Sequence, residues 1–294
     1  MTSSHSRPRR SVLYMPGSNA RALEKSRTLA ADTVILDLED SVASEMKAEA
    51  RALVAETLSQ GGFGRRELVI RINGLDTEWG ATDLAAAIKA EPHAILVPKI
   101  NSAADVARIE EAMKSAAVGI ALWCMIEMPL AILNIREIAA RASERGARLR
   151  GFVMGTNDLV KELLAAQTPD RLPLLPSLGL ALLAARAYGL AIIDGVYNDI
   201  KDEAGFELVC VQGRDMGFDG KTLIHPSQLE ACNRIFSPSP DTISFSRKVI
   251  EAFARPENAS KGVLTVDGKM VELLHAESAR RVVAIADAIE AMKH

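Results

Sequence analysis

Several features that assign a chain to a common class are scarce or missing from these 294 residues. No apolar run approaches the roughly 18 residues that a membrane-spanning helix needs, so we expect no membrane partner. Acidic residues outnumber basic ones and the net charge is −3, so the basic footprint of a nucleic-acid-binding protein is absent. The opening stretch MTSSHSRPRR is polar and basic without an apolar run behind it. We therefore expect no secretory signal and a disordered arm over residues 1–10.

Cysteine and histidine are too few and too scattered for a disulfide framework or a zinc site. The three cysteines, Cys124, Cys210 and Cys232, are far apart and odd in number. This pattern favours free thiols in a reducing, cytoplasmic location. Among the five histidines, two are terminal and three are isolated, so none has the spacing of a Zn²⁺ ligand set.

What the chain does have is a regular alternation of short apolar runs with helical stretches. Eight runs rich in Val, Ile and Leu predict strands at residues 11–15, 33–38, 67–72, 94–98, 119–126, 150–154, 190–194 and 220–224. Eight strand-then-helix units match a (β/α)₈ TIM barrel, an α/β fold whose apolar strands are covered on both faces. The alternative is an open doubly wound sheet with a phosphate loop after its first strand. Residues 15–23, MPGSNARAL, lack the G-x-G-x-x-G pattern of that loop.

The chain continues beyond a barrel predicted over residues 11–236. The Pro- and Ser-rich stretch 236–246 predicts a linker. A helix near 241–255, a hairpin over 262–272 turning at Asp267-Gly268, and a last helix near 275–292 follow it. This small C-terminal hairpin-plus-helix extension, residues 237–294, is too short to fold alone. We expect it to serve as a lid on the barrel or on a neighbouring subunit.

Polar side chains end five of the predicted strands, at the barrel face where TIM-barrel active sites lie. In chain order they are Asp37 with Glu39, Arg71, Lys99, Glu127 and Asp194. Alternation along a strand predicts that Asp37, Glu39, Arg71 and Glu127 point toward the barrel axis. Lys99 is predicted to point inward because it shares parity with Ile95 and Val97.

Glu127 and Asp158 follow neighbouring predicted strands and together suggest a metal site. A carboxylate that ends an eight-residue apolar strand must be paired or bind a cation, which favours a functional Glu127. Asp158 can serve the same site or cap the next helix, as Asn157 can. Two carboxylates with room for water suit Mg²⁺, which often takes only one or two protein carboxylates.

The stretch VILDLEDSVA, residues 34–43, places three acidic side chains within four positions. Asp40 and Ser41 precede a predicted helix, and capping its free N–H groups is the simplest reading of both. Arg71 is expected to form an ion pair with Asp37 or Glu39, which is compatible with a role in binding.

Eight motifs in barrel order carry a family resemblance. They are LYMPGSNARALEKS (13–26), ILDLEDSVA (35–43), VIRINGLDTEWGATDL (69–84), ILVPKI (95–100), MIEMPLAILN (125–134), GTNDL (155–159), AIIDGVYNDIKD (191–202) and GFDGKTLIHPSQL (217–229). Together they resemble the citrate lyase beta-subunit-like family of the HpcH/HpaI aldolase and citrate lyase superfamily, alongside malyl-CoA and citramalyl-CoA lyases. The resemblance covers nearly the whole chain.

The resemblance implies a Mg²⁺-dependent carbon–carbon lyase. Its substrate would be a 3-hydroxy-3-carboxyacyl-CoA such as malyl-CoA, citramalyl-CoA or citryl-CoA, cleaved to (or formed from) a 2-oxo acid and an acyl-CoA. Two alternatives stay open. One is a malyl-CoA-type thioesterase on the same scaffold, and the other is a citryl-ACP or citryl-CoA lyase subunit of a larger complex.

By motif match the resemblance also implies roles for single residues. Glu127 and Asp158 would hold the metal, and Arg71 would stabilise negative charge on the substrate. Glu39 and Asp40 would hold waters on the metal, a role for Asp40 that disagrees with helix capping. The implied substrate-binding set is Arg71, Glu127, Lys99, Glu39 and Asp40.

The remaining implied contacts concern CoA and the chain's C-terminal part. Tyr14, Arg21 and Lys25 would meet the CoA phosphates or adenine. Malyl-CoA lyases carry a C-terminal Asp that reaches a neighbouring subunit's site, and Glu272 stands at that position here. Glu272 can still transfer a proton and is the third catalytic candidate with Arg71 and Glu127, although it also suits the first turn of the last helix. The tail predicts an oligomer because it needs a surface to cover, and we expect a homotrimer or homohexamer.

Overall fold

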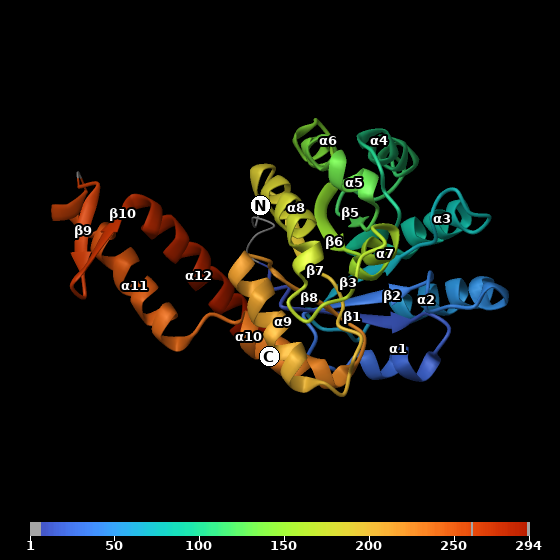
Figure 1. Cartoon of the computed structure of the whole chain (residues 1–294), viewed down its shortest axis with the longest axis horizontal. Helices are drawn as coiled ribbons and strands as arrows, with labels where there is room; N and C mark the ends of the chain where they lie inside the picture. The colour runs from blue at the N-terminus through green and yellow to red at the C-terminus, as the bar shows by residue number, and fades with distance from the viewer. Residues whose placement is uncertain (1–6, 260, 293–294) are drawn as a thin grey trace. The chain divides into compact units, whose positions relative to one another are not determined.

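The computed structural model describes residues 7–259 and 261–292 (Figure 1). These residues form two compact units, which are described separately: residues 9–236, and residues 237–292 together with 7 and 8. Within the described part of the chain, no helix combines the length and the apolar character needed to cross a membrane.

Eight parallel strands close into a barrel in the first unit, in the order β1 to β8. Their bounds are β1 Ser11–Pro16, β2 Thr33–Asp37, β3 Glu67–Arg71, β4 Ala94–Val97, β5 Ala121–Ile126, β6 Leu149–Met154, β7 Ala191–Asp194 and β8 Gly220–Leu223. β1 pairs with both β2 and β8, which closes the sheet on itself. The predicted TIM-barrel fold is therefore confirmed, and each strand lies within two residues of its expected bounds.

Helices surround these strands (Figure 1). They are α1 Ala20–Ser26, α2 Lys47–Gln60, α3 Gly80–Ala90, α4 Ala103–Ala112, α5 Pro129–Leu133, α6 Ile135–Ala140, α7 Thr156–Glu162, α8 Leu175–Ala187, α9 Glu203–Met216 and α10 Leu229–Phe236. Short 3₁₀ helices are η2 Ser44–Met46, η3 Arg141–Ser143, η4 Leu172–Leu174 and η5 Pro226–Gln228. Local chemistry sets several of their starts. Ser102, for example, caps α4 in a capping box with Asp105.

The apolar side chains of the barrel separate into two layers. The layer between strands and helices contains Val34, Leu36, Leu38, Leu68 and Ile70. The layer inside the barrel contains Val12, Ile35, Val69, Trp123, Met125 and Ile193. The predicted alternation is therefore confirmed for β2, β3 and β5.

The N-terminal residues differ in part from the expected arm. Residues 1–6 lie outside the described part. Arg9, which is buried, donates to the Glu67 carboxylate at 2.6 and 2.8 Å. Arg10 donates to the Asp32 carboxylate at 2.7 and 2.8 Å. These ion pairs fix both arginines to the barrel unit, so the expectation of disorder is wrong for these two residues.

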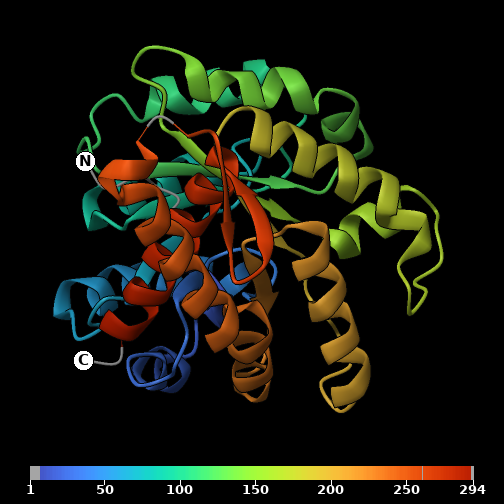
Figure 2. The same ribbon diagram turned by 90° about the vertical axis from the view of Figure 1, so that its left-hand side faces the viewer.

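The second unit contains α11 Pro240–Ala254, η6 Pro256–Asn258, β9 Val263–Val266, β10 Lys269–Glu272 and α12 Leu273–Ala291. The strands pair as an antiparallel hairpin, whose turn residues Asp267 and Gly268 have φ of 47° and 75° (Figure 2). Positive φ at both turn positions is what a tight type I′ hairpin requires. Val249, Val266, Val271, Ala276 and Ala279 form this unit's apolar cluster.

The linker expected over residues 236–246 is much shorter in the structure. α10 ends at Phe236 and α11 begins at Pro240, so three residues separate them. The Ser239 hydroxyl accepts the Thr242 N–H at 3.1 Å, and Pro240 follows as the first helical residue. Ser-Pro at a helix start is a capping signature, which explains why a Pro- and Ser-rich stretch became helical.

Candidate active site

A cavity of about 280 Å³ lies at the carboxyl ends of the barrel strands. Among its lining residues are Tyr14, Asp37, Asp40, Arg71, Glu127 and Asp158. A neighbouring cavity of about 290 Å³ shares four lining residues with it, Thr156, Asn157, Val196 and Asn198. Because Arg71, Glu127 and Asp158 line only the first of the two, the candidate chemistry lies there.

Arg71 is the fixed cation of this cavity. As the last residue of β3 it points inward, and its guanidinium donates to both Asp37 oxygens at 2.6 and 2.7 Å. Its Nη1 lies 2.8 Å from Glu39 Oε2 and 3.0 Å from Asp40 Oδ2. Burial opposes the charge, but the neighbouring carboxylates raise the pKa of Arg71 well above its usual value. The expected Arg71–Asp37 ion pair is confirmed, and Arg71 stays charged.

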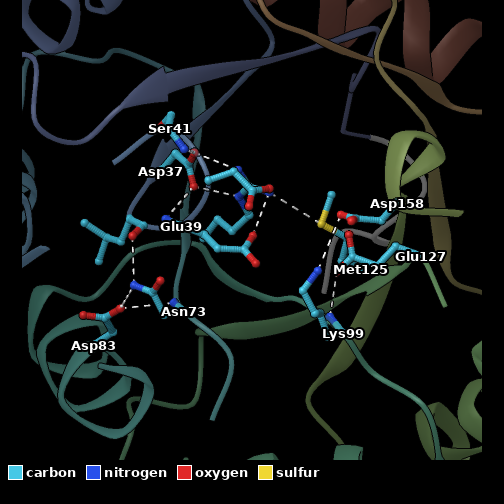
Figure 3. Close-up of polar contacts among 12 residues, drawn as sticks. Asp37, Glu39, Ser41, Asn73, Asp83, Lys99, Met125, Glu127 and Asp158 are labelled. Carbon is cyan, nitrogen blue, oxygen red and sulfur yellow. Dashed lines mark hydrogen bonds and ion pairs between the residues drawn. The ribbon is translucent and has the colours of Figure 1, made fainter. Parts of the chain in front are cut away.

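Asp37 builds a turn with Glu39 and Ser41 at the end of β2 (Figure 3). β2 ends at Asp37, whose carboxylate accepts the backbone N–H of Glu39 at 3.0 Å and of Ser41 at 3.2 Å. This turn directs Asp40 to Arg71, and no side chain caps η2 or α2. Helix capping by Asp40 and Ser41 is therefore wrong, and Asp40 belongs to the site.

Glu39 is a buried carboxyl that pairs with Arg71. Burial raises its pKa to about 8, although the Arg71 charge works in the other direction. Its Oε2 is buried and lies 2.8 Å from Arg71 Nη1 as an ion pair, with no further hydrogen-bond partner among the described residues. Lys47 from α2 holds the turn by donating to the Leu38 and Glu39 carbonyls at 2.9 and 2.8 Å. Glu39 therefore lies beside Arg71, behind the residues that line the cavity.

Glu127 lies just beyond β5 and is 1% exposed. Its Oε1 accepts the Lys99 backbone N–H at 2.8 Å. Burial raises the pKa of Glu127 to about 7. Gly155 makes this placement possible, because a Cβ at Gly155 would lie 2.4 Å from Glu127 Cβ and 2.5 Å from Oε2. The glycine of the GTNDL motif is thus a steric requirement of the site, which the sequence reasoning missed.

Asp158 lies in the first turn of α7 and lines the same cavity as Glu127. α7 has no side-chain cap, so capping by Asp158 or Asn157 is wrong. Asn157 instead exchanges hydrogen bonds with Asn198 at 2.8 and 3.2 Å. The described residues contain no group of three or more His, Cys, Asp or Glu side chains placed to hold a metal. A two-carboxylate site fits Mg²⁺, which keeps several waters and takes one or two protein carboxylates.

Lys99 reaches the site by a different route from the one predicted. In β4 the inward residues are Ala94 and Leu96, whereas Ile95 and Val97 lie in the outer layer. The parity argument for Lys99 is therefore wrong. Lys99 follows the strand with a left-handed φ of 54°, and its Nζ lies 3.6 Å from Asp158 Oδ2. Partial burial opposes the charge, but the carboxylates of Glu127 and Asp158 raise the pKa of Lys99.

Two further predicted positions are placed differently from the rest of the site. Asp194 lies on the helix side of β7, where Lys221 and Arg171 pair with it at 2.9 and 2.7 Å. It does not line the cavity, so its placement at the internal face is wrong. Glu272 belongs to the second unit, where it is the N-cap residue of α12.

The predicted CoA contacts lie on and near β1. The Tyr14 ring faces inward with its centroid 4.8 Å from Arg71 Cζ. The Tyr14 hydroxyl is buried without a hydrogen-bond partner among the described residues, and burial raises its pKa. Arg21 and Lys25 are exposed on α1 and do not line the cavity. The structure thus brings Tyr14 to Arg71 and leaves the other two at the surface.

Comparison with known proteins identifies the family. Residues 10–226 match the family model described as HpcH/HpaI aldolase/citrate lyase. The chain belongs to the HpcH/HpaI aldolase/citrate lyase family. The match spans the barrel with its cavity residues, so the resemblance seen in the sequence motifs is confirmed.

Relatives within this family have more than one named activity. A (3S)-malyl-CoA thioesterase of Cereibacter sphaeroides is 53% identical over 286 residues, covering 97% of each chain. A citrate lyase subunit beta of Escherichia coli is 36% identical, covering 96% of this chain and 94% of its own. A crystal structure of CitE from Mycobacterium tuberculosis in complex with magnesium, acetoacetate and coenzyme A has a TM-score of 0.73 and 28% identity. That match covers 94% of this chain and 99% of the solved one.

Proposed function

We propose that this protein is a Mg²⁺-dependent enzyme that hydrolyses a 3-hydroxy-3-carboxyacyl-CoA thioester of the malyl-CoA type. The products would be free CoA and the intact hydroxy acid. The observation that carries the substrate class is that one fixed cation, Arg71, and two carboxylates, Glu127 and Asp158, line the same cavity. The 53% identity to a (3S)-malyl-CoA thioesterase over 97% of both chains favours hydrolysis as the reaction.

The residues divide the work by charge. Glu127 and Asp158 are the two groups that would hold Mg²⁺, which when bound supplies a Lewis acid for the substrate's carboxylate and hydroxyl oxygens. Arg71 is buried, and its guanidinium donates to both oxygens of Asp37. Its positive charge is therefore already oriented and can stabilise an oxyanion without movement of the side chain. Glu39 pairs with Arg71 from behind the cavity lining and, by the family resemblance, would help to hold water on the metal.

The product pattern tests this proposal directly. The purified protein is incubated with malyl-CoA and Mg²⁺, and thioesters are separated from free CoA by chromatography. We expect free CoA and malate in equal amounts, and no turnover after EDTA treatment that Mg²⁺ then restores. Acetyl-CoA and glyoxylate as the main products would reject hydrolysis and favour carbon–carbon cleavage.

Carbon–carbon cleavage is the second candidate, supported by the citrate lyase subunit beta relative and by the family itself. Cleavage leaves an acyl-CoA enolate that must gain a proton. Glu272 stays our candidate for that acid, supplied by an extension acting as a lid in a homotrimer or homohexamer. Arg21 and Lys25, exposed on α1, stay our candidates for contacts with the CoA phosphates.

A further inference from the structure

One residue contacts both carboxylates that would hold the metal, and it does so with two different groups (Figure 3). The Lys99 backbone N–H donates to Glu127 Oε1 at 2.8 Å, and the Lys99 ammonium lies 3.6 Å from Asp158 Oδ2. A φ of 54° is uncommon for a residue with a Cβ, and such strain concentrates at functional positions. The left-handed turn directs the amide toward one carboxylate and the side chain toward the other.

The two contacts differ in how freely they can change. Glu127 is 1% exposed, and its bond to the Lys99 amide is fixed by the backbone. The Lys99 side chain is 44% exposed and that of Asp158 is 26% exposed. A four-carbon stem with a hydrated ammonium can leave such a contact at little cost. Arg71 cannot, because its side chain is 7% exposed and both Asp37 oxygens hold it.

We propose that Lys99 is a tethered cation that neutralises Asp158 in the metal-free protein and is displaced when Mg²⁺ binds. The inference rests on the proposed assignment of Glu127 and Asp158 as metal ligands. An ammonium group and a dication at the same carboxylate repel each other, so the Lys99 charge must lower the affinity for Mg²⁺. Once displaced, the ammonium stays near the cavity and adds positive charge for an anionic substrate.

The inference predicts effects of opposite sign from a single substitution. Lys99→Met keeps the backbone N–H and the length of the stem but removes the charge. Mg²⁺ affinity, measured by calorimetry or by Mn²⁺ electron paramagnetic resonance without substrate, should rise about two- to fivefold, the range expected for a partly exposed ion pair. The KM for the acyl-CoA should rise in the same variant. High salt should reduce both changes, because it screens exposed charges.

Matched variants separate charge from structure. Lys99→Arg retains a positive charge and should bind Mg²⁺ like the wild type. Lys114→Met removes a surface lysine that pairs with Glu111 and should change neither quantity. If Lys99→Met fails to fold by circular dichroism, Lys99→Gln repeats the test.

The outcomes also distinguish this inference from the proposed function. If Glu127→Gln weakens Mg²⁺ binding but Lys99→Met leaves it unchanged or weaker, the tethered-cation role of Lys99 is overturned. If the Glu127→Gln protein binds Mg²⁺ as tightly as the wild type, the assignment of Glu127 as a metal ligand is wrong. The inference about Lys99, which rests on that assignment, is then wrong as well.

Discussion

Replacing Gly155 with alanine should displace Glu127 without removing any functional group from the site. The added Cβ would lie 2.4 Å from Glu127 Cβ and 2.5 Å from its Oε2. Ordinary contact begins near 3.4 Å, so the two elements must separate by about 1 Å. Rotation of the Glu127 side chain gives no relief, because its Cβ is fixed by the backbone of the segment after β5.

The size of the effect follows from that displacement. A misplacement of about 1 Å at a reacting centre costs about 100-fold in rate, so kcat/KM should fall by about that factor. Mg²⁺ affinity should fall at least about tenfold, or 1.4 kcal/mol, because one of two carboxylate ligands moves. Overpacking costs about 1–3 kcal/mol of stability, less than a typical domain possesses, so the variant should remain folded.

A second glycine provides the control. At Gly179, inside α8, an added Cβ meets no atom within 4 Å. Gly179→Ala should therefore add about 0.5–1 kcal/mol of stability, because alanine favours a helix over glycine, and leave turnover unchanged. The measurements are steady-state kinetics, Mg²⁺ titration calorimetry and thermal melting for both variants. A Gly155→Ala protein with wild-type turnover and wild-type Mg²⁺ affinity would refute the assigned geometry of Glu127.

Three other substitutions test separate parts of the barrel unit. Glu127→Gln should abolish Mg²⁺-dependent turnover. The metal-free variant should be no less stable than the wild type at pH 8, because burial raises the pKa of Glu127 to about 7 and opposes its charge. Near-normal turnover would contradict the role of Glu127 as a metal ligand. Arg71→Lys should lower kcat/KM at least about 100-fold and keep the Mg²⁺ affinity, because an ammonium group cannot donate to both Asp37 oxygens in the planar geometry of a guanidinium. Full activity would show that a single positive charge at this position is enough. Asp194→Asn should cost about 3–5 kcal/mol at pH 7. Asp194 is buried, but the neighbouring Lys221 ammonium holds the pKa of its carboxyl below 3.8. The stabilisation that ionised Asp194 gives the fold is therefore present above pH 3.8 and lost as the pH falls below it. Urea unfolding should show this loss of stability at acid pH for the wild type and not for the variant.

Alternation along the strand predicted the inward side chains of β2, β3 and β5 correctly. In β2 and β3, apolar positions alternate with Asp37 and Arg71, and burial of both faces leaves no freedom in which side chain points inward. The same argument places Glu127 beside Met125 inside the barrel. Side chains alternate between the two faces wherever the backbone is extended, so Asp37, Arg71 and Glu127 follow the pattern.

Two of the residues that the sequence misplaced, Asp40 and Lys99, lie beyond the end of a strand. Asp40 turns inward because the Asp37 carboxylate binds two backbone N–H groups and closes a turn. Lys99 turns because its own φ is positive. Neither the turn nor the sign of φ follows from apolar periodicity. Asp194 failed for a different reason. It lies within β7, where alternation places it with Ile192 on the helix side, and its partners Lys221 and Arg171 meet it there.

The charges of the cavity explain why a dication suits this site. The acidic side chains at or beside it are Asp37, Glu39, Asp40, Glu127 and Asp158, and the basic ones are Arg71 and Lys99. If all are ionised, five negative charges face two positive ones, a net charge of −3 at the entrance for an anionic acyl-CoA. Burial together with this excess raises the pKa of Glu39 to about 8 and of Glu127 to about 7. A bound Mg²⁺ would add two positive charges at this entrance, and so would favour the binding of an anionic substrate.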